Sequence, residues 1–397
     1  MIAAEVKTIT SEEEFRSLES DWTRLHCSAK GTIFQTFSWC WNWWKVYGKR
    51  GAGLHIVTSR IDGRLSAILP LYLENIRGIG VSLGRLRMIG VYETYGEYKI
   101  LAGSESSAES VRAIAGELTR QLATPGFDIL SLFRFPPDSE PMVELICQLR
   151  GSGLRSRYVA QVIKRVMMDL PDSWEAYLAM LSSNERESIR RKTKNLLKTG
   201  AEIEVIENPD PAAFADYVRL HSDSWRPRGV KGYFSSGEFT TFLGNVTLDL
   251  MPGGYARLYF LKKDGKRFAA VHAFFMHDQC CFYLSGLDRT HELLHMSPGK
   301  VLLAHVIHDA IDRGYRIFDF QGGDEDYKFQ LGGKVTSFAK AIFWPNDRRS
   351  IKIIVFLLLQ AFRQGLRWRI SERFVPAVRS LLPGSRKPRP TPGEQRG

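Results

Sequence analysis

The chain has 397 residues, a length that predicts two or three domains of ordinary size. Hydrophobic residues make up 44% of it and charged residues 25%, which is the composition of a folded protein and excludes wholesale disorder. The net charge is +12, and no apolar run reaches the ~18–20 residues of a membrane-spanning helix, so we expect no integral membrane segment.

The positive charge is concentrated in the C-terminal tail. Residues 347–397 contain twelve Lys or Arg and three Asp or Glu, a net of +9 that leaves +3 for the first 346 residues. Nucleic-acid enzymes more usually spread their positive charge over a folded face. We therefore expect no nucleic-acid partner.

Cysteine usage and the first residues predict a cytoplasmic protein. The five cysteines are odd in number and lack C-x-x-C spacing, which argues against a disulfide framework or a cysteine zinc site. The opening MIAAEVKTITSEEEF lacks the basic-then-apolar pattern of an export signal.

Periodicity predicts an α/β first half. Ser11–Leu25 is typical of an amphipathic helix, because Ser11 and Glu14 form a capping-box pattern and the apolar residues share one stripe. A hairpin is predicted around the turn at 61–64. The other expected elements are helices over 34–44, 108–123 and 140–149, with strands over 54–60, 65–73 and 127–133.

The same order of elements begins again after Val159. Helices are expected over 174–180, 185–198, 211–224, 236–250 and 298–313, and strands over 202–206, 257–261, 268–276, 280–285 and 316–320. The segments 60–73 and 125–133 correspond in character to 262–275 and 313–321. This predicts an internal duplication, with chance sharing of common hairpin patterns as the alternative.

Beyond Trp344-Pro345, residues 351–362 are strongly apolar and bracketed by arginines, whereas 384–397 have the composition of a disordered tail. The apolar segment predicts either a peripheral membrane contact through 348–373 or a helix packed on the second domain.

Three motifs carry chemistry, each with a plainer alternative. His291-Glu292-Leu293-Leu294-His295 has zincin spacing, but the Ser-Pro-Gly that follows at once predicts a loop or single turn, so we expect no metal. Ser297-Pro298-Gly299-Lys300 predicts a helix N-terminus, with Ser297 as N-cap, that can hold a pyrophosphate or is simply a good helix start. Residues 184–194 form a basic helix that either grips an acidic substrate or is a solvated face.

The run at 318–329 ends a strand in two glycines, then three acids, Tyr327 and Lys328. A carboxylate there, Asp319 or Asp324, can take a proton from an incoming amine or hydroxyl, and Tyr327 can protonate a departing thiolate. Lys328 can stabilise an oxyanion. A solvated acidic turn is the alternative.

These segments resemble a known family. The run WEAYLAMLSSNERESIRRKTKNLLKTG resembles the opening of the second half of FemAB-like and CelD-type acyltransferases, which are GNAT-related. Residues 284–333 resemble their S-G-x-D, S-P-G and D-F-x-x-G-D-x-x-Y-K signature, and WTRL, TFSWCWNWW and AILPLYL resemble first-half positions. The resemblance spans roughly 10–345.

The resemblance implies two tandem GNAT-like α/β domains, 1–165 and 166–345, each a mixed sheet flanked by helices, followed by a basic helical tail at 346–397. It implies an acyltransferase, with acetyl-CoA or another acyl-CoA as donor and a sugar or cell-envelope polysaccharide precursor as acceptor. The alternatives are a FemAB-type aminoacyl transferase to a peptidoglycan precursor and a non-catalytic accessory protein. A peripheral position on the inner membrane face would suit such substrates.

The expected site residues fall into three groups. Catalytic roles are assigned to Asp319, Asp324, Tyr327 and Lys328, and donor binding to Ser297, Pro298, Gly299 and Lys300. Substrate binding is assigned to Trp39, Arg186, Arg190 and Asp288.

Overall fold

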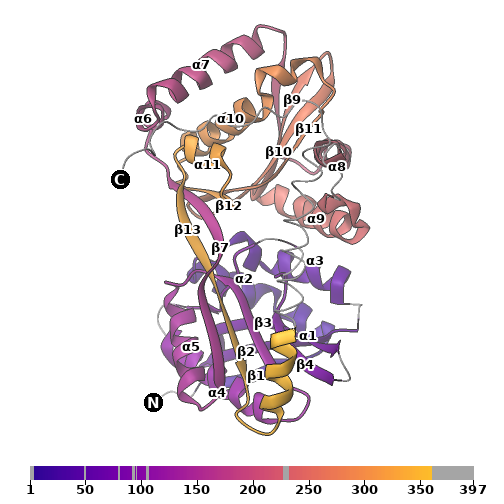
Figure 1. Ribbon diagram of the computed structural model, residues 1–397, viewed down its shortest axis with the longest axis vertical. Helices are drawn as coiled ribbons and strands as arrows, with labels where there is room; N and C mark the ends of the chain where they lie inside the picture. The colour runs from indigo at the N-terminus through magenta and orange to yellow at the C-terminus, as the bar shows by residue number, and fades with distance from the viewer. Residues whose placement is uncertain are drawn as a thin grey trace, which may run out of the picture.

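The computed structural model describes residues 4–48, 51–78, 81–91, 94, 96–103, 107–226 and 232–359. Figure 1 shows two lobes joined by two long strands. The first half contains β1 (Glu5–Ile9), α1 (Glu12–Ser17), α2 (Glu19–Ser28), the short 3-10 helix η1 (Ile33–Gln35), α3 (Phe37–Tyr47), β2 (Gly53–Ile61), β3 (Arg64–Gly78), β4 (Val81–Met88), β5 (Leu101–Ala102), α4 (Ser107–Ala123), β6 (Ile129–Phe135), α5 (Glu140–Gly151) and β7 (Arg155–Asp169).

The second half repeats this order after two extra helices, α6 (Trp174–Met180) and α7 (Ser183–Leu197). Its elements are β8 (Glu202–Ile206), α8 (Pro211–Trp225), η4 (Tyr233–Ser235), α9 (Gly237–Leu250), η5 (Met251–Gly253), β9 (Ala256–Lys263), β10 (Lys266–Met276), β11 (Gln279–Leu287), η6 (Glu292–Met296), α10 (Pro298–Asp312), β12 (Ile317–Gly322), α11 (Asp326–Gln330) and β13 (Lys334–Trp344).

One mixed sheet runs through both lobes in the order β1-β2-β3-β4-β6-β13-β7-β12-β11-β10-β9-β8, with β5 paired to β3 off this path. The order is palindromic if each strand of the first half is matched with its counterpart in the second. The two halves exchange their last strands: β13 pairs with β6, and β7 pairs with β12. The expected division between residues 165 and 166 falls inside β7.

Backbone details support the internal duplication. Each hairpin turn uses an Asp-Gly pair in the left-handed region, with φ of 49° at both Asp62 and Asp264. The parallel pairing of β4 with β6 ends at Arg87 and Ser131, and that of β11 with β12 ends at Cys281 and Asp319. Ser131 and Asp319 are corresponding positions in the two repeats.

The local signals read from the sequence explain the element boundaries. The Ser11 hydroxyl accepts from the Glu14 backbone N–H at 3.2 Å, so the predicted cap is confirmed, although the helix breaks into α1 and α2 near Leu18. Asp210 caps α8 by accepting from the N–H groups of Ala212 and Ala213.

Two main hydrophobic cores lie on the sheet. The larger one contains the aromatic residues of α3 and reaches across to α9, where Trp39 packs edge-on against Phe242 at 5.1 Å between ring centres. The second lies within the upper lobe under α10. Among the described residues, no helix is both long and apolar enough to cross a bilayer.

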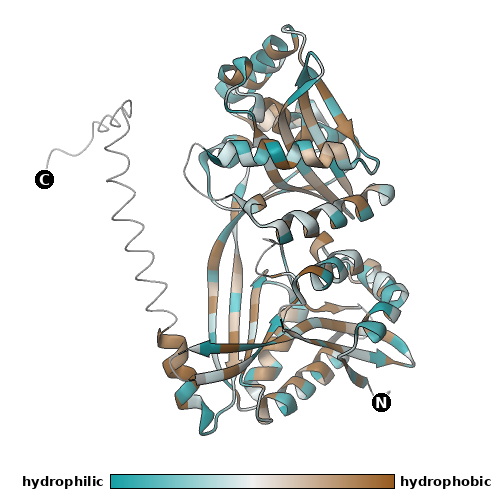
Figure 2. Ribbon diagram, turned by 90° about the vertical axis from the view of Figure 1, so that its right-hand side faces the viewer, coloured by the Kyte–Doolittle hydropathy of each residue, from teal (hydrophilic) through white to brown (hydrophobic). Residues whose placement is uncertain are grey.

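A helix over residues 349–359 follows β13. Its Ile353 is fully buried in a small cluster with Leu83, Ile129 and Trp344, so this face packs on the first lobe. Figure 2 shows most of this helix in the brown of hydrophobic residues. The rest of the expected tail, including 384–397, lies outside the described residues.

Candidate active site

The strands β11 and β12 part in the middle of the upper lobe. They pair in parallel only through Gln279–Cys281 and Ile317–Asp319, after which β12 continues beside β7. Beyond Cys281, the described chain supplies no strand partner for β11 on its β12 side. Strand edges without a partner expose backbone N–H and C=O groups that a ligand can use.

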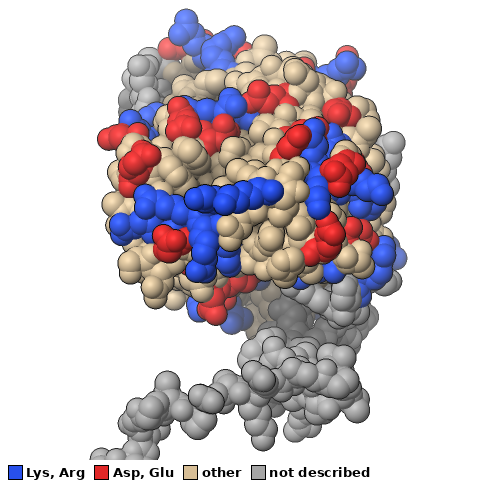
Figure 3. All heavy atoms as spheres, turned by 90° about the horizontal axis from the view of Figure 1, so that it is seen from above, with Lys and Arg blue, Asp and Glu red and all other residues tan. Residues whose placement is uncertain are grey.

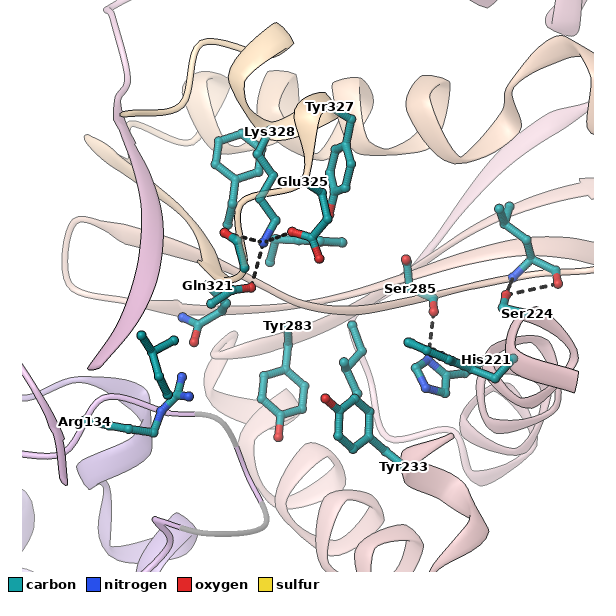
Figure 4. Close-up of a pocket in the computed structure, with 18 of the residues that line it drawn as sticks. Arg134, His221, Ser224, Tyr233, Tyr283, Ser285, Gln321, Glu325, Tyr327 and Lys328 are labelled. Atoms are coloured by element: carbon teal, nitrogen blue, oxygen red, sulfur yellow. Dashed lines mark hydrogen bonds and ion pairs between the residues drawn. The ribbon is translucent and has the colours of Figure 1, made fainter. Parts of the chain in front are cut away.

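A cavity of about 400 Å³ occupies this gap. Most of its wall comes from α8, β11, β12 and α11, with Arg134 of β6 and Ile163 of β7 closing it from the other lobe. Figure 4 shows Lys328, Glu325 and Tyr327 on one side, Tyr283, Tyr233 and His221 on the other, and Arg134 at the lobe boundary. Because β7 and β13 are exchanged between the halves, residues of both halves line this cavity.

A β-bulge lies in the cavity wall. Ala273 of β10 faces Phe282 and His272 faces Leu284, so Tyr283 is an extra residue in β11. Its phenol donates to the backbone carbonyl of Thr94 in the first lobe at 2.9 Å. The bulge changes the direction of the β11 backbone close to the point where its pairing with β12 ends.

Lys328 lies in the cavity wall. It belongs to α11 and is only 2% exposed. Its ammonium group donates to the Gly322 carbonyl at 2.7 Å and lies 2.9 Å from a Glu325 carboxylate oxygen. Lys328 therefore holds the two-glycine loop in place.

Tyr327 also lines the cavity, whereas Asp324 does not. Burial, and then the nearby Glu325 carboxylate, raise the pKa of the Tyr327 phenol. Asp324 pairs with Lys164 at 2.6 Å on the exposed surface. The hydrogen bond and charge of Lys164 lower the pKa of the Asp324 carboxyl.

The structure corrects the expectation that Asp319 meets substrate. Its side chain is fully buried and forms an ion pair at 2.7 Å with Arg165, which also pairs with Glu97 of the first lobe. Burial opposes the charge of Arg165, but Asp319 and Glu97 outweigh it and raise the pKa of Arg165. Asp319 is therefore a structural residue: its ion pair with Arg165 connects β12 to β7, and Arg165 in turn connects them to Glu97 of the first lobe.

The predicted helix start is confirmed, since α10 begins at Pro298. Ser297 occupies the N-cap position in a left-handed conformation, but its side chain makes no capping bond, which corrects the expected role. Its hydroxyl instead accepts from the Lys192 ammonium of α7 at 2.9 Å. Lys300 forms an ion pair with Glu185 of α7.

The N-terminus of α10 is next to the cavity. A Cβ on Gly299 would lie 3.4 Å from the side chain of Leu287, which lines the cavity.

The four expected substrate-binding residues do not line the cavity. Trp39 is fully buried in the core and cannot meet a ligand, because Phe34, Phe242, Phe274 and Tyr283 surround it. Asp288 accepts from the backbone and hydroxyl of Thr290 and so shapes the turn after β11.

The remaining two, Arg186 and Arg190, belong to α7. Arg186 donates to the Leu181 carbonyl at 3.3 Å, whereas Arg190 is exposed. Figure 3, which looks onto the end of the molecule where α7 lies, shows a broad band of lysines and arginines. The HExxH run forms the short η6, as expected, and not the middle of a long helix.

Most of the cavity residues were not among the site residues expected from the sequence, and these include Arg134, His221, Tyr233 and Tyr283. One signal was available for His221. The tripeptide Arg-Leu-His occurs at 24–26 in α2 and again at 219–221 in α8, the same place in both repeats.

Residues 183–329 match the family model described as an acetyltransferase (GNAT) domain. The crystal structure of FemX is similar in fold, with a TM-score of 0.60 and 13% identity over 86% of this chain and 98% of that one. The C-terminal domain of a putative lysylphosphatidylglycerol synthetase from Agrobacterium fabrum follows, with a TM-score of 0.52 and 12% identity over 86% and 95%. No curated protein matches the chain.

The matched acetyltransferase (GNAT) domain contains the parted strands β11 and β12. The same order of elements occurs in the first half, so the fold is that of two tandem GNAT-like domains. GNAT domains in general use acyl-CoA donors.

Proposed function

We propose that the protein is an N-acetyltransferase that moves an acetyl group from acetyl-CoA to an amine on a sugar or cell-envelope polysaccharide precursor. The observation that supports this most is the cavity between β11 and β12, one wall residue of which, Leu287, adjoins the N-terminus of α10.

The chemistry of the site fits such a donor. The thioester and its pantetheine amides are hydrogen-bonding groups, and the unpaired edge of β11 offers backbone partners for them. The pyrophosphate is anionic, and the first turn of α10 offers N–H groups and the positive end of the helix dipole. Lys192 and Lys300 of the same region add positive charge, each already held by one partner.

The chain's own residues supply the rest of the transfer. The acceptor binds in the cavity, where Tyr283 and Tyr233 present aromatic faces and Arg134 closes the far side. The Tyr327 phenol lines the cavity and carries a proton at neutral pH, which it can give to the departing thiolate. Lys328 keeps the Gly322-Gly323 loop in shape, and Asp324 with Lys164 stabilises the same loop from outside.

An aminoacyl donor is the competing reaction. The likeness to FemX is one of fold at 13% identity and carries no substrate with it. The body of the protein is nearly neutral, which favours a small coenzyme over a charged RNA.

The donor is tested by calorimetry with acetyl-CoA on the full chain. Gly299→Asp places a negative charge at the N-terminus of α10, where it suits the helix dipole but repels a pyrophosphate. We expect wild-type binding and a loss of about tenfold or more in the variant, which corresponds to ~1.4 kcal/mol.

Gly237→Asp is the matched control, because it adds the same charge to the first turn of α9, where a Cβ meets nothing within 4 Å. It should bind as wild type does. No binding of acetyl-CoA at millimolar concentration, or equal weakening in both variants, would contradict the proposed donor. If acetyl-CoA binds as expected, the release of CoA after glucosamine is added measures the acetyl transfer itself.

We also propose that the C-terminal helix brings the protein to an anionic membrane face at the cytoplasmic side. Ile351, Val355 and Leu358 are 72%, 47% and 62% exposed and recur at helical spacing. Arg348 and Lys352 flank this stripe, and the sequence continues with further arginines.

A further inference from the structure

His221 has an unusually constrained place in the cavity wall. Its helix α8 lies so close to β11 that a Cβ on Gly286 would come within 2.4 Å of the His221 backbone nitrogen. Only glycine permits this approach. Three bonds then tie the two elements: His221 to the Ser285 carbonyl at 2.8 Å, Ser224 to the Leu287 carbonyl at 3.2 Å, and the Leu287 N–H to Ser224 at 2.6 Å.

The bond to Ser285 sets which ring nitrogen of His221 carries the proton. A carbonyl can only accept, so Nδ1 must donate, and in the neutral ring Nε2 is left with a lone pair. Nε2 is buried and has no hydrogen-bond partner among the described residues. Such a buried acceptor costs roughly 1–3 kcal/mol unless a ligand satisfies it.

The surroundings keep the ring neutral. Burial lowers the pKa of His221, and the Ser285 bond opposes this only in part. The aromatic rings packed nearest to it include Phe234 and the titratable Tyr233 of η4, with centres 5.1 Å and 6.0 Å away, and Tyr217 of α8 at 6.4 Å. His272 of β10 lies beyond Tyr217, and no charged group contributes to the shift.

The first repeat offers an internal comparison. His26 stands at the same Arg-Leu-His position in α2, but there Nε2 bonds to the Thr32 carbonyl of the following loop at 2.8 Å. The first repeat thus uses Nε2 of its histidine for a loop contact, whereas Nε2 of His221 has no hydrogen-bond partner among the described residues.

We propose that His221 is the general base of the transfer, with Nε2 accepting the proton of the attacking amine. The amine nitrogen forms a bond to the thioester carbon, and its proton passes to Nε2. The carbon–sulfur bond then breaks, and Tyr327 gives its proton to the departing thiolate, so that CoA leaves as the thiol. The imidazolium releases its proton to solvent and the Tyr327 phenolate takes one from solvent, which restores both groups. This role rests on the proposed acetyl transfer.

His221→Gln tests the role, because glutamine can still donate to the Ser285 carbonyl but cannot take up a proton. The measurement is kcat/KM for CoA release with acetyl-CoA and glucosamine as a function of pH. The ratio of wild type to variant cancels the titration of the amine itself. We expect a ratio of about 10²–10⁴ near pH 8 that falls toward unity as the pH drops through the imidazole pKa.

His26→Gln is the matched control and should keep wild-type activity at every pH. An independent readout is the tautomer, measured by ¹⁵N NMR of labelled histidine, which should show an unprotonated Nε2 at His221. A pH-independent ratio, or a protonated Nε2 at neutral pH, would overturn the proposal while leaving the acetyl donor standing. Absence of CoA release by wild type would instead overturn the donor.

Discussion

At the scale of single residues, Lys328 shows how burial changes the meaning of a motif. Its ammonium group bonds to the Gly322 carbonyl and pairs with Glu325, and its side chain is 3% exposed. Removing such a buried donor would leave the Gly322 carbonyl without its partner, which destabilises the fold. The last residue of the D-F-x-x-G-D-x-x-Y-K signature, Lys328, therefore has a structural role.

Lys328→Ala should lower the free energy of unfolding by roughly 1–3 kcal/mol, because it leaves the Gly322 carbonyl without its donor. Urea titration measures this. Lys164→Ala, which removes only the exposed pair with Asp324, should cost less than about 1 kcal/mol. Equal stability of Lys328→Ala and wild type would contradict the structural role.

At the scale of elements, the helix over 349–359 has two apolar faces. One face covers Leu83 and Ile129 through Ile353, and the other leaves Ile351, Val355 and Leu358 exposed. A helix apolar on both faces usually meets a second apolar surface. The sequence predicted packing on the second domain, whereas Ile353 packs on the first lobe. The membrane contact stays a prediction, and the exposed face is the one that it would use.

Replacing Ile351, Val355 and Leu358 together by Ser should reduce co-sedimentation with vesicles containing anionic lipid, since apolar burial and charge attraction act together at such interfaces. The core face stays intact, so the melting temperature should change little. The control is the same assay with zwitterionic vesicles, to which we expect weak binding of either protein. Equal pelleting of variant and wild type with anionic vesicles would rule out this contact surface.

At the scale of the whole molecule, strand exchange makes the two halves interdependent. β7 supplies the neighbour of β12, and β13 supplies the neighbour of β6. The buried Arg165 links Asp319 of one lobe to Glu97 of the other. Neither half carries its complete sheet on its own.

Fragments 1–170 and 171–397 should therefore be poorly soluble when expressed alone and should co-purify as a folded complex when expressed together. Each alone exposes the edges of a central strand, which favours aggregation. Size-exclusion chromatography and circular dichroism would report the outcome. A soluble, monomeric and cooperatively unfolding single fragment would show that the lobes are independent.

Of the expected site residues, only Tyr327 and Lys328 line the cavity, and the sequence did not predict the environment of the others. The α10 start and the strand ending in two glycines follow from local turn and cap chemistry, which depends on neighbouring residues. The burial of Asp319 and Trp39 depends on Arg165 and on α9, which are distant in the chain. No local pattern distinguishes a carboxylate facing a cavity from one in a buried ion pair.

The sequence by itself determined the repeated order of elements, the turns of both hairpins and the GNAT-like fold class, because hydrophobic period and backbone preference act over a few residues. Only the tertiary structure decided the strand exchange and the cavity that joins Arg134 to the second repeat. It also decided the tautomer of His221. These features depend on which long-range contacts form, and equivalent local sequences in the two repeats are compatible with either outcome.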